Sequence, residues 1–180
     1  MAEARLERVG SGLAPVTEGW FVVNVRDAAW LRSDTFGRRC VLEANGAVVR
    51  GNGRPPVTFP QTGFTVAVLE PGQPSTLYHA ETAEENFLVV TGECVATFEG
   101  EQRLLRRWDF AHCPPGTLHA FRGAGTGPCI LVAVGARPDD HRVRYEPTPL
   151  AESVAEPTTS PVEAYAAYGH WRNEGPPPEL

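Results

Sequence analysis

The sequence contains no lysine. Its sixteen Lys-or-Arg positions are all arginines, set against 22 acidic residues, and the formal net charge is −6. Without a lysine amine the chain cannot form a Schiff base with pyridoxal phosphate or a carbonyl substrate, so chemistry of that kind is excluded. The acidic balance also provides no basic surface for a nucleic acid or an anionic membrane, and we expect neither as a partner.

Long hydrophobic runs are also missing. The longest, such as Cys129–Val134, are far shorter than the roughly 20 residues that a membrane helix needs. Residues 1–10 mix both charges and lack the apolar stretch of a secretory signal peptide. The cysteines form no C-x-x-C pair and are scattered along the chain, at Cys40, Cys94, Cys113 and Cys129. These absences predict a soluble, cytoplasmic protein with reduced thiols.

Short runs rich in β-branched and aromatic residues follow one another closely in the middle of the chain, separated by Gly and Pro. They span Phe64–Glu70, Thr76–Glu81, Phe87–Val90, Cys94–Phe98, Gln102–Arg106, Ala111–Cys113, Leu118–Phe121 and Ile130–Val134. Between two of them, Glu99-Gly100 is a two-residue hairpin signal, since Gly takes a positive φ readily. Strands of this length and spacing predict an all-β antiparallel sandwich or barrel.

The barrel domain is expected over residues 19–136. Residues 1–18 are polar and are expected to form a loosely held N-terminal segment. Within the domain, we predict a strand at Trp20–Val25, a helical turn at Asp27–Trp30 and another strand at Arg38–Ala44. These elements would extend the sheets of the barrel or supply a subunit interface.

Residues 137–180 are expected to form a C-terminal tail. This part is charged, proline-containing and aperiodic, and a short helix is predicted at Pro161–Tyr168, with Pro in its first turn. Its two histidines, His141 and His170, lie among charges and prolines rather than in a strand pattern. We therefore expect the chain after about Arg137 to lie outside the barrel and to hold no metal ligand.

Two groups of metal-capable side chains are the clearest chemical signal. In a strand, side chains alternate between faces, so His79 and Glu81 point the same way, and Glu85 lies a short turn further on. His119 follows the rigid turn Pro114-Pro115-Gly116 on a distant strand. The alternative is that the first group is a solvated surface loop. Two carboxylates directed into an apolar barrel would instead need a compensating cation.

These two segments resemble the sequence motifs of the cupin superfamily, G-x5-H-x-H-x3,4-E-x6-G and G-x5-P-x-G-x2-H-x3-N. Glu85 keeps the motif's spacing to Gly92. Pro114, Gly116 and His119 are all in register with the second motif. The residues of the second segment, from Trp108 to His119, are similar in sequence to the second motif of small single-domain bacterial cupins.

The chain departs from the cupin motifs in four places. The first spacer is one residue longer, and Glu81 stands where the second His is usual. Trp108 replaces the opening Gly of the second motif, and Gly123 replaces its closing Asn. The resemblance implies the cupin double-stranded β-helix, a jelly-roll barrel, here with an N-terminal strand extension and a short C-terminal helical tail.

In cupins, the ligand positions of the two motifs bind one metal ion. The resemblance implies that one divalent transition metal is held by His79, Glu81, Glu85 and His119. Two imidazoles with one or two carboxylates suit Zn, Fe, Mn, Ni or Co. If Glu81 does not ligate the metal, its carboxylate is a candidate catalytic acid or base in the barrel pocket. Both arrangements are compatible with catalysis.

Other polar residues near these segments have simpler explanations. His112 lies outside the motif's ligand positions, and we expect it to pack or hydrogen-bond near the site. Cys113 is expected to be a small buried side chain rather than a ligand or a reactive thiol. Arg106, Arg107 and Arg122 are expected to be solvated charges, the alternative being that they clamp an anionic substrate.

We therefore predict a metal-dependent cupin enzyme that acts on a small organic molecule, with oxygenase, isomerase or epimerase, and lyase chemistry all open. The alternatives are a cupin that binds or senses a small molecule without turnover, and a metal-free cupin used for structure. A homodimer is expected, because cupins pair through sheet edges and an open jelly roll has edges to protect.

Overall fold

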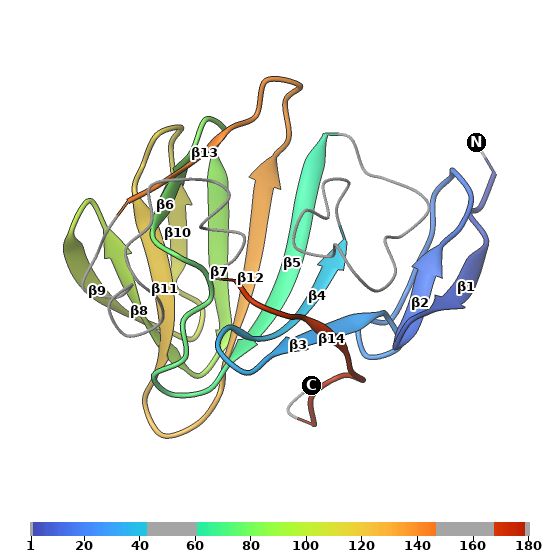
Figure 1. Cartoon of the computed structure of the whole chain (residues 1–180), viewed down its shortest axis with the longest axis horizontal. Coiled ribbons are helices and arrows are strands. Elements are labelled where there is room, and N and C mark those ends of the chain that lie inside the picture. The colour runs from blue at the N-terminus through green and yellow to red at the C-terminus, as the bar shows by residue number, and fades with distance from the viewer. Residues whose placement is uncertain (1, 43–60, 147–167, 179–180) are drawn as a thin grey trace.

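The computed structural model of the chain describes residues 2–42, 61–146 and 168–178, and all the regular elements among them are β-strands (Figure 1). The strands form a hairpin, a seven-stranded sheet and a five-stranded sheet, all with antiparallel pairing. Among the described residues, no helix is long and apolar enough to cross a membrane.

The two larger sheets enclose the interior of the molecule. The hairpin consists of β1 (Leu6–Val9) and β2 (Gly12–Pro15). The seven-stranded sheet has the order β10 (Phe110–Cys113), β7 (Glu85–Thr91), β12 (Cys129–Ala136), β5 (Thr62–Leu69), β4 (Gly37–Leu42), β3 (Trp30–Ser33), β14 (Arg172–Asn173). The five-stranded sheet has the order β13 (Val143–Tyr145), β6 (His79–Glu81), β11 (His119–Ala124), β8 (Glu93–Phe98), β9 (Glu101–Arg106). This architecture confirms the predicted all-β jelly roll with an N-terminal strand extension.

The barrel core lies between the two large sheets. Its buried members are Phe87, Val89, Cys94, Ala96, Cys113, Phe121, Cys129 and Leu131. They come from both sheets, since β7, β10 and β12 belong to the seven-stranded sheet and β8 and β11 belong to the five-stranded sheet. Burial of a large apolar side chain stabilises the fold by roughly 1.5–3 kcal/mol, so this cluster holds the two sheets together.

The N-terminal region differs from the expectation. Residues 1–18 are not loosely held, since they contain the β1–β2 hairpin. The Ser11 hydroxyl donates to the Trp30 carbonyl at 2.6 Å and accepts from the Trp30 N–H at 2.7 Å. The Leu13 N–H donates to the Asp27 carbonyl at 2.7 Å. Such long-range backbone contacts leave no periodic signal in a short polar sequence.

The predicted strand at Trp20–Val25 is wrong. Val23 and Val25 pack against a second apolar cluster, built on Trp30, Val66 and the outer face of the seven-stranded sheet. Apolar residues here cover a sheet with their side chains instead of pairing through their backbone. The predicted helical turn also shifts: the Ala28 N–H donates to the Asn24 carbonyl at 3.1 Å, and Trp30 already belongs to β3.

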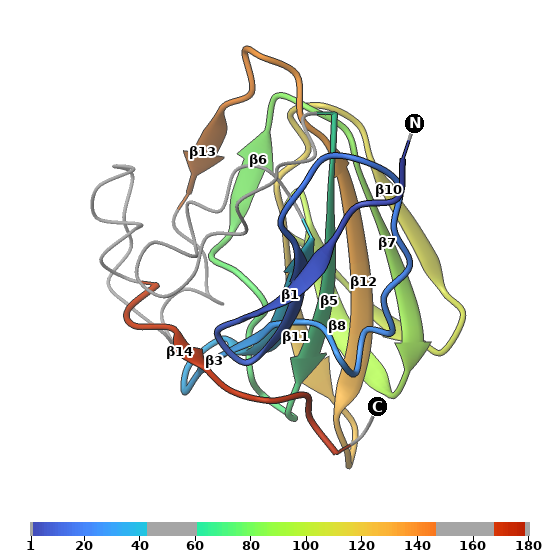
Figure 2. The ribbon, with the colours of Figure 1, turned by 90° about the vertical axis from the view of Figure 1, so that its right-hand side faces the viewer.

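The expectation that the chain after Arg137 lies outside the barrel is also wrong. Strand β13 lies beside β6 in the side view (Figure 2). The two strands pair, and their register places Tyr145 opposite His79 and Val143 opposite Glu81. A strand of three residues is too short to produce a detectable alternation. The helix predicted at Pro161–Tyr168 falls, apart from Tyr168, outside the described residues.

Two turns match the sequence signals. Glu99 and Gly100 both take positive φ, 49° and 83°, so the β8–β9 connection is the predicted two-residue hairpin. Trp108 has φ 73°, which means that it occupies a left-handed position where the motif's usual Gly would be unstrained.

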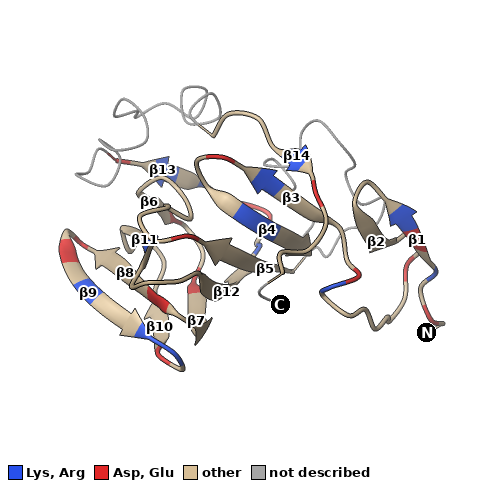
Figure 3. Cartoon of the chain, turned by 90° about the horizontal axis from the view of Figure 1, so that it is seen from below, with Lys and Arg blue, Asp and Glu red and all other residues tan. Residues whose placement is uncertain are grey.

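Arginine-bearing stretches are spread over β1, β3, β4, β9, β13 and β14 rather than gathered on one strand (Figure 3).

A matched pair of glycine substitutions tests the turn between β7 and β8. At Gly92 (φ 74°) an added Cβ would lie 2.3 Å from the Pro128 carbonyl oxygen, whereas at Gly100 (φ 83°) it would meet nothing within 4 Å. We expect Gly100→Ala to lower the free energy of unfolding by about 1 kcal/mol, from φ strain alone. Gly92→Ala should cost at least about 2–3 kcal/mol, because overpacking adds to the strain. Equal losses in urea denaturation would contradict this explanation.

Candidate metal centre

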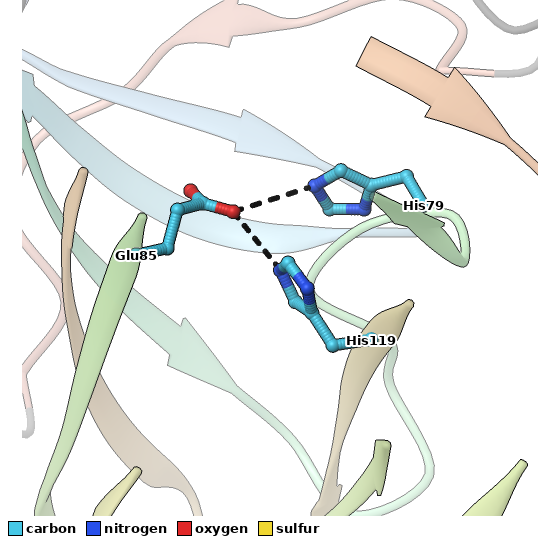
Figure 4. Close-up of side chains that lie close together, drawn as sticks. All are labelled: His79, Glu85 and His119. Atoms are coloured by element: carbon cyan, nitrogen blue, oxygen red, sulfur yellow. Dashed lines mark ion pairs between the residues drawn. The ribbon is translucent and has the colours of Figure 1, made fainter. Parts of the chain in front are cut away.

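Three buried side chains from three strands converge inside the barrel. His79 lies on β6, Glu85 begins β7 and His119 begins β11, and their ligand atoms all lie within 4.8 Å of one another. Figure 4 shows the two imidazoles and the carboxylate directed toward the same point. The Glu85 Oε2 atom lies 3.1 Å from His119 Nε2 and 4.0 Å from His79 Nε2. A metal bonded at about 2.1 Å needs ligand atoms roughly 3 to 4 Å apart, so the group fits a transition metal.

Backbone acceptors orient both imidazoles in the same way. The His79 Nδ1–H donates to the Leu77 carbonyl at 2.7 Å, and the His119 Nδ1–H donates to the Thr117 carbonyl at 2.9 Å. A carbonyl only accepts, so Nδ1 must carry the proton and the Nε2 lone pair of a neutral ring points at the site. Such a contact to the second ring nitrogen is the usual support of a metal-binding histidine.

Strand register explains why these residues meet. His119 pairs directly with His79 across β11 and β6, and their ring centroids lie 4.6 Å apart. The Pro-Pro-Gly turn that precedes His119 is tied to the other motif, because the Gly116 N–H donates to the Glu81 carbonyl at 2.7 Å. Gly116 takes φ 88° at this turn, a value that favours glycine.

The site has buried polar atoms that the described residues do not satisfy. Glu85 Oε2 and His119 Nε2 are close but not aligned as a hydrogen bond, and neither has a hydrogen-bond partner in the described part of the chain. The Glu85 side chain is 9% exposed and that of His119 is 2% exposed. Leaving such atoms unpaired in an apolar interior costs free energy, which a bound cation would recover.

The protonation states of His79, His119 and Glu85 follow from their burial and from the groups beside them. Burial, together with the nearby His119, lowers the pKa of His79 to about 4, so this ring is neutral at physiological pH. Burial alone would disfavour a charged His119, but its contacts with the Cys113 thiol and the Glu85 carboxylate raise its pKa to about 10. Burial likewise opposes ionisation of Glu85, yet the adjacent imidazoles and Arg137 outweigh it and lower the pKa of this carboxyl. Without a metal, His119 and Glu85 therefore form an ion pair.

Comparison with known proteins identifies the segment that contains His79, Glu85 and His119. Residues 65–135 match the family model described as a cupin domain, a range that includes all three converging residues. This segment is a cupin domain. The chain has no match among curated proteins.

Solved structures similar to this chain also include cupins. The structure of KdgF from a Halomonas species has a TM-score of 0.51 at 20% identity, and the match covers 68% of this chain and 98% of that one. It supports the fold. A sugar phosphate isomerase of the cupin superfamily from Silicibacter pomeroyi has a TM-score of 0.46 at 26% identity, over 49% of this chain. This chain spans 58% of the length of that protein. A putative sugar phosphate isomerase from Acidithiobacillus ferrooxidans has a TM-score of 0.45 at 24% identity, over 64% of this chain and 67% of that one.

Glu81, which occupies the place of the second cupin histidine, lies beside the three converging residues. Its Oε1 is 3.8 Å from His79 Nε2. Its Oε2 accepts a hydrogen bond from His141 Nε2–H at 2.7 Å and another from Arg137 Nη1 at 3.2 Å. Burial and the nearby Glu85 raise the pKa of Glu81, while Arg137 and the hydrogen bond from His141 oppose that rise. The carboxylate is thus engaged on one oxygen by residues outside the cupin motifs.

Sequence reasoning missed His141 and Arg137. Both follow β12, in a stretch that was expected to lie away from the site. No local signal in the sequence marks β13 (Val143–Tyr145), because three residues are too few to show an alternation. Only the pairing of β13 with β6 brings the preceding His141 next to the end of β6.

The remaining candidates lie largely as expected. His112 is exposed, and its Nδ1–H donates to Asn86 Oδ1 at 2.8 Å. Cys113 is buried, directly opposite Glu85 in the β10–β7 register, where its thiol contacts His119. Arg106 and Arg107 are exposed at the barrel surface, which fits solvated charge.

Metal affinity should weaken as the pH falls. His119 holds a proton in the metal-free protein up to a pKa of about 10, and a metal must displace that proton, whereas His79 is already neutral above about 4. One proton is therefore released on binding, and the apparent association constant should rise about tenfold per pH unit between about pH 6 and about pH 8. Chelator-competition titrations with zinc or cobalt at several pH values measure this slope. An affinity independent of pH over this range would show that His119 releases no proton when the metal binds.

Proposed function

We propose that this cupin is a metal-dependent enzyme that acts on a small organic molecule, with one divalent transition metal held by His79, Glu85 and His119. The observation that carries the proposal is the convergence of two carbonyl-oriented imidazoles on a buried carboxylate. Structural packing alone does not account for this group, because it leaves Glu85 Oε2 and His119 Nε2 unsatisfied among the described residues.

Three protein ligands leave further coordination positions open for a substrate, in contrast to the closed shell of a structural metal site. When bound, the metal supplies Lewis acidity or a centre that activates oxygen or water. His79 and His119 provide neutral nitrogen ligands whose direction the backbone fixes, and Glu85 provides the charged oxygen. The surrounding rings, with Phe87 5.2 Å from His119 between centroids, exclude water from the ligands.

Glu81 is the proposed acid–base group. Its raised pKa moves the carboxyl toward the range in which it can exchange protons near neutral pH. Because Oε2 is held by Arg137 and His141, Oε1 is the oxygen left to accept and return a proton of a bound molecule.

Ligand substitutions test the metal site. We expect His79→Ala and His119→Ala to lose stoichiometric metal, because each removes one of three ligands, and Glu85→Gln to weaken binding at least about tenfold. Glu81→Gln should keep about one metal per chain. The exposed His112→Ala is the matched control for loss of an imidazole. Elemental analysis of purified, folded proteins measures all five, and wild-type metal content in every variant would overturn the site.

Turnover is tested separately from metal binding. Metal-loaded and metal-stripped protein should be screened against small organic molecules, with binding heat and product formation followed together. We expect metal-dependent product formation that Glu81→Gln abolishes while it retains metal. Binding without product in both wild type and variant would instead assign the protein as a non-catalytic binding or sensing cupin.

We also propose a homodimer assembled through the β10 side of the seven-stranded sheet. Among the described residues, β10 is the outermost strand of this sheet, and it carries Phe110, which is 64% exposed. The neighbouring Trp108 is 62% exposed. An exposed edge strand with large apolar side chains is typically covered in soluble proteins.

Light scattering tests the assembly. We expect twice the chain mass of 19.5 kDa at micromolar concentration. Phe110→Glu should shift the protein to monomer, because a charge would be buried in the interface. Leu104→Glu on β9, where the side chain is 48% exposed, is the control. A wild-type mass near 19.5 kDa would contradict the dimer.

A further inference from the structure

The Glu81 carboxylate accepts hydrogen bonds from two side chains, Arg137 and His141, which follow strand β12 in the chain. His141 Nε2 lies 2.7 Å and Arg137 Nη1 lies 3.2 Å from the same atom, Glu81 Oε2. All three side chains are nearly buried, with exposures of 14% for His141, 11% for Arg137 and 9% for Glu81. Hydrogen bonds to a buried carboxylate are among the stronger ones in proteins, so this contact determines where the carboxylate lies.

The backbone holds both partners in place. The Arg137 N–H donates to the Gln61 carbonyl at 2.9 Å. The residue after His141 is bound twice to the end of β6: the Thr82 N–H donates to the Arg142 carbonyl at 3.0 Å, and the Arg142 N–H donates to Thr82 Oγ1 at 2.8 Å. His141 and Arg137 therefore approach Glu81 from a segment that is already ordered, which lowers the entropic cost of the contact.

Gly135 leaves room for this arrangement. A Cβ at Gly135 would lie 2.5 Å from Arg137 Nη1 and 3.2 Å from Glu85 Oε1. The guanidinium thus passes next to the metal-binding carboxylate on its way to Glu81. Its positive charge faces both carboxylates of the site.

The two contacts act on one oxygen of Glu81 only. A ligand oxygen must approach a metal to about 2.1 Å, and an oxygen bound by a guanidinium and an imidazole has to give up those bonds to do so. The other oxygen, Oε1, stays beside the metal group, 3.8 Å from His79 Nε2.

We propose that Arg137 and His141 are positioning residues that keep Glu81 out of the metal's coordination shell and direct its free oxygen at the bound molecule. This inference rests on the proposed metal site and adds a function for the chain after β12. It also explains why a carboxylate can replace the usual cupin histidine here: the added negative charge has its own partners in Arg137 and His141, so it need not bind the metal.

Cobalt-substituted full-length protein tests the proposal, since the visible absorption of Co²⁺ reports its coordination number and ligands. We expect His141→Ala, and more strongly His141→Ala combined with Arg137→Ala, to change the spectrum and to tighten cobalt binding about tenfold, because the released Glu81 joins the shell. Adding Glu81→Gln should abolish both changes. His141→Gln, whose amide still donates, should restore the wild-type spectrum, and exposed His170→Ala should have no effect.

The outcomes separate the two proposals. A wild type that binds cobalt with a spectrum insensitive to His141→Ala and to the double variant overturns the positioning role alone. A change that persists in the presence of Glu81→Gln also overturns it, because Glu81 would then not be the added ligand. A wild type that binds no cobalt overturns the metal site and, with it, this inference. Thermal melts of each variant establish that the compared proteins are folded.

Discussion

The structure depends on one electrostatic constraint, the burial of the Glu85 carboxylate between two imidazoles in an apolar barrel. A charge in such surroundings is costly unless an opposite charge lies beside it. In the metal-free chain a proton on His119 meets this need, and contacts with the Cys113 thiol and the Glu85 carboxylate raise the pKa of His119 to about 10 against the effect of burial. A metal ion would occupy the same position between the same atoms. A proton and a metal ion therefore compete for the same position at His119 Nε2.

In the metal-free protein, the backbone and the strand pairing already fix the positions of His79, Glu85 and His119. The backbone carbonyls at Leu77 and Thr117 each fix an imidazole by its Nδ1–H. Direct pairing of His119 with His79 joins β11 to β6, and β7 brings Glu85 from the opposite sheet. Because these three side chains come from both sheets, the core that holds the sheets together also holds their relative geometry.

Glu81 shows how a change at one position of a site requires changes at others. A carboxylate in place of an imidazole adds a negative charge next to Glu85, and each of these two carboxylates disfavours ionisation of the other. Arg137 restores the balance, because with a divalent metal the two carboxylates and one guanidinium leave the site with a net positive charge.

The sequence by itself determined the all-β class, the Glu99-Gly100 hairpin and the convergence of His79, Glu85 and His119 inside the barrel. Alternation of side chains along strands and the chemistry of Gly and Pro turns act over a few residues, and so they are readable locally. Only the tertiary structure decided that the N-terminal residues form a hairpin and that Glu81 faces His141. The latter contact joins residues 60 positions apart, through a three-residue strand that has no readable period. Contacts of this kind depend on how whole sheets pair, because no short stretch of sequence contains both partners.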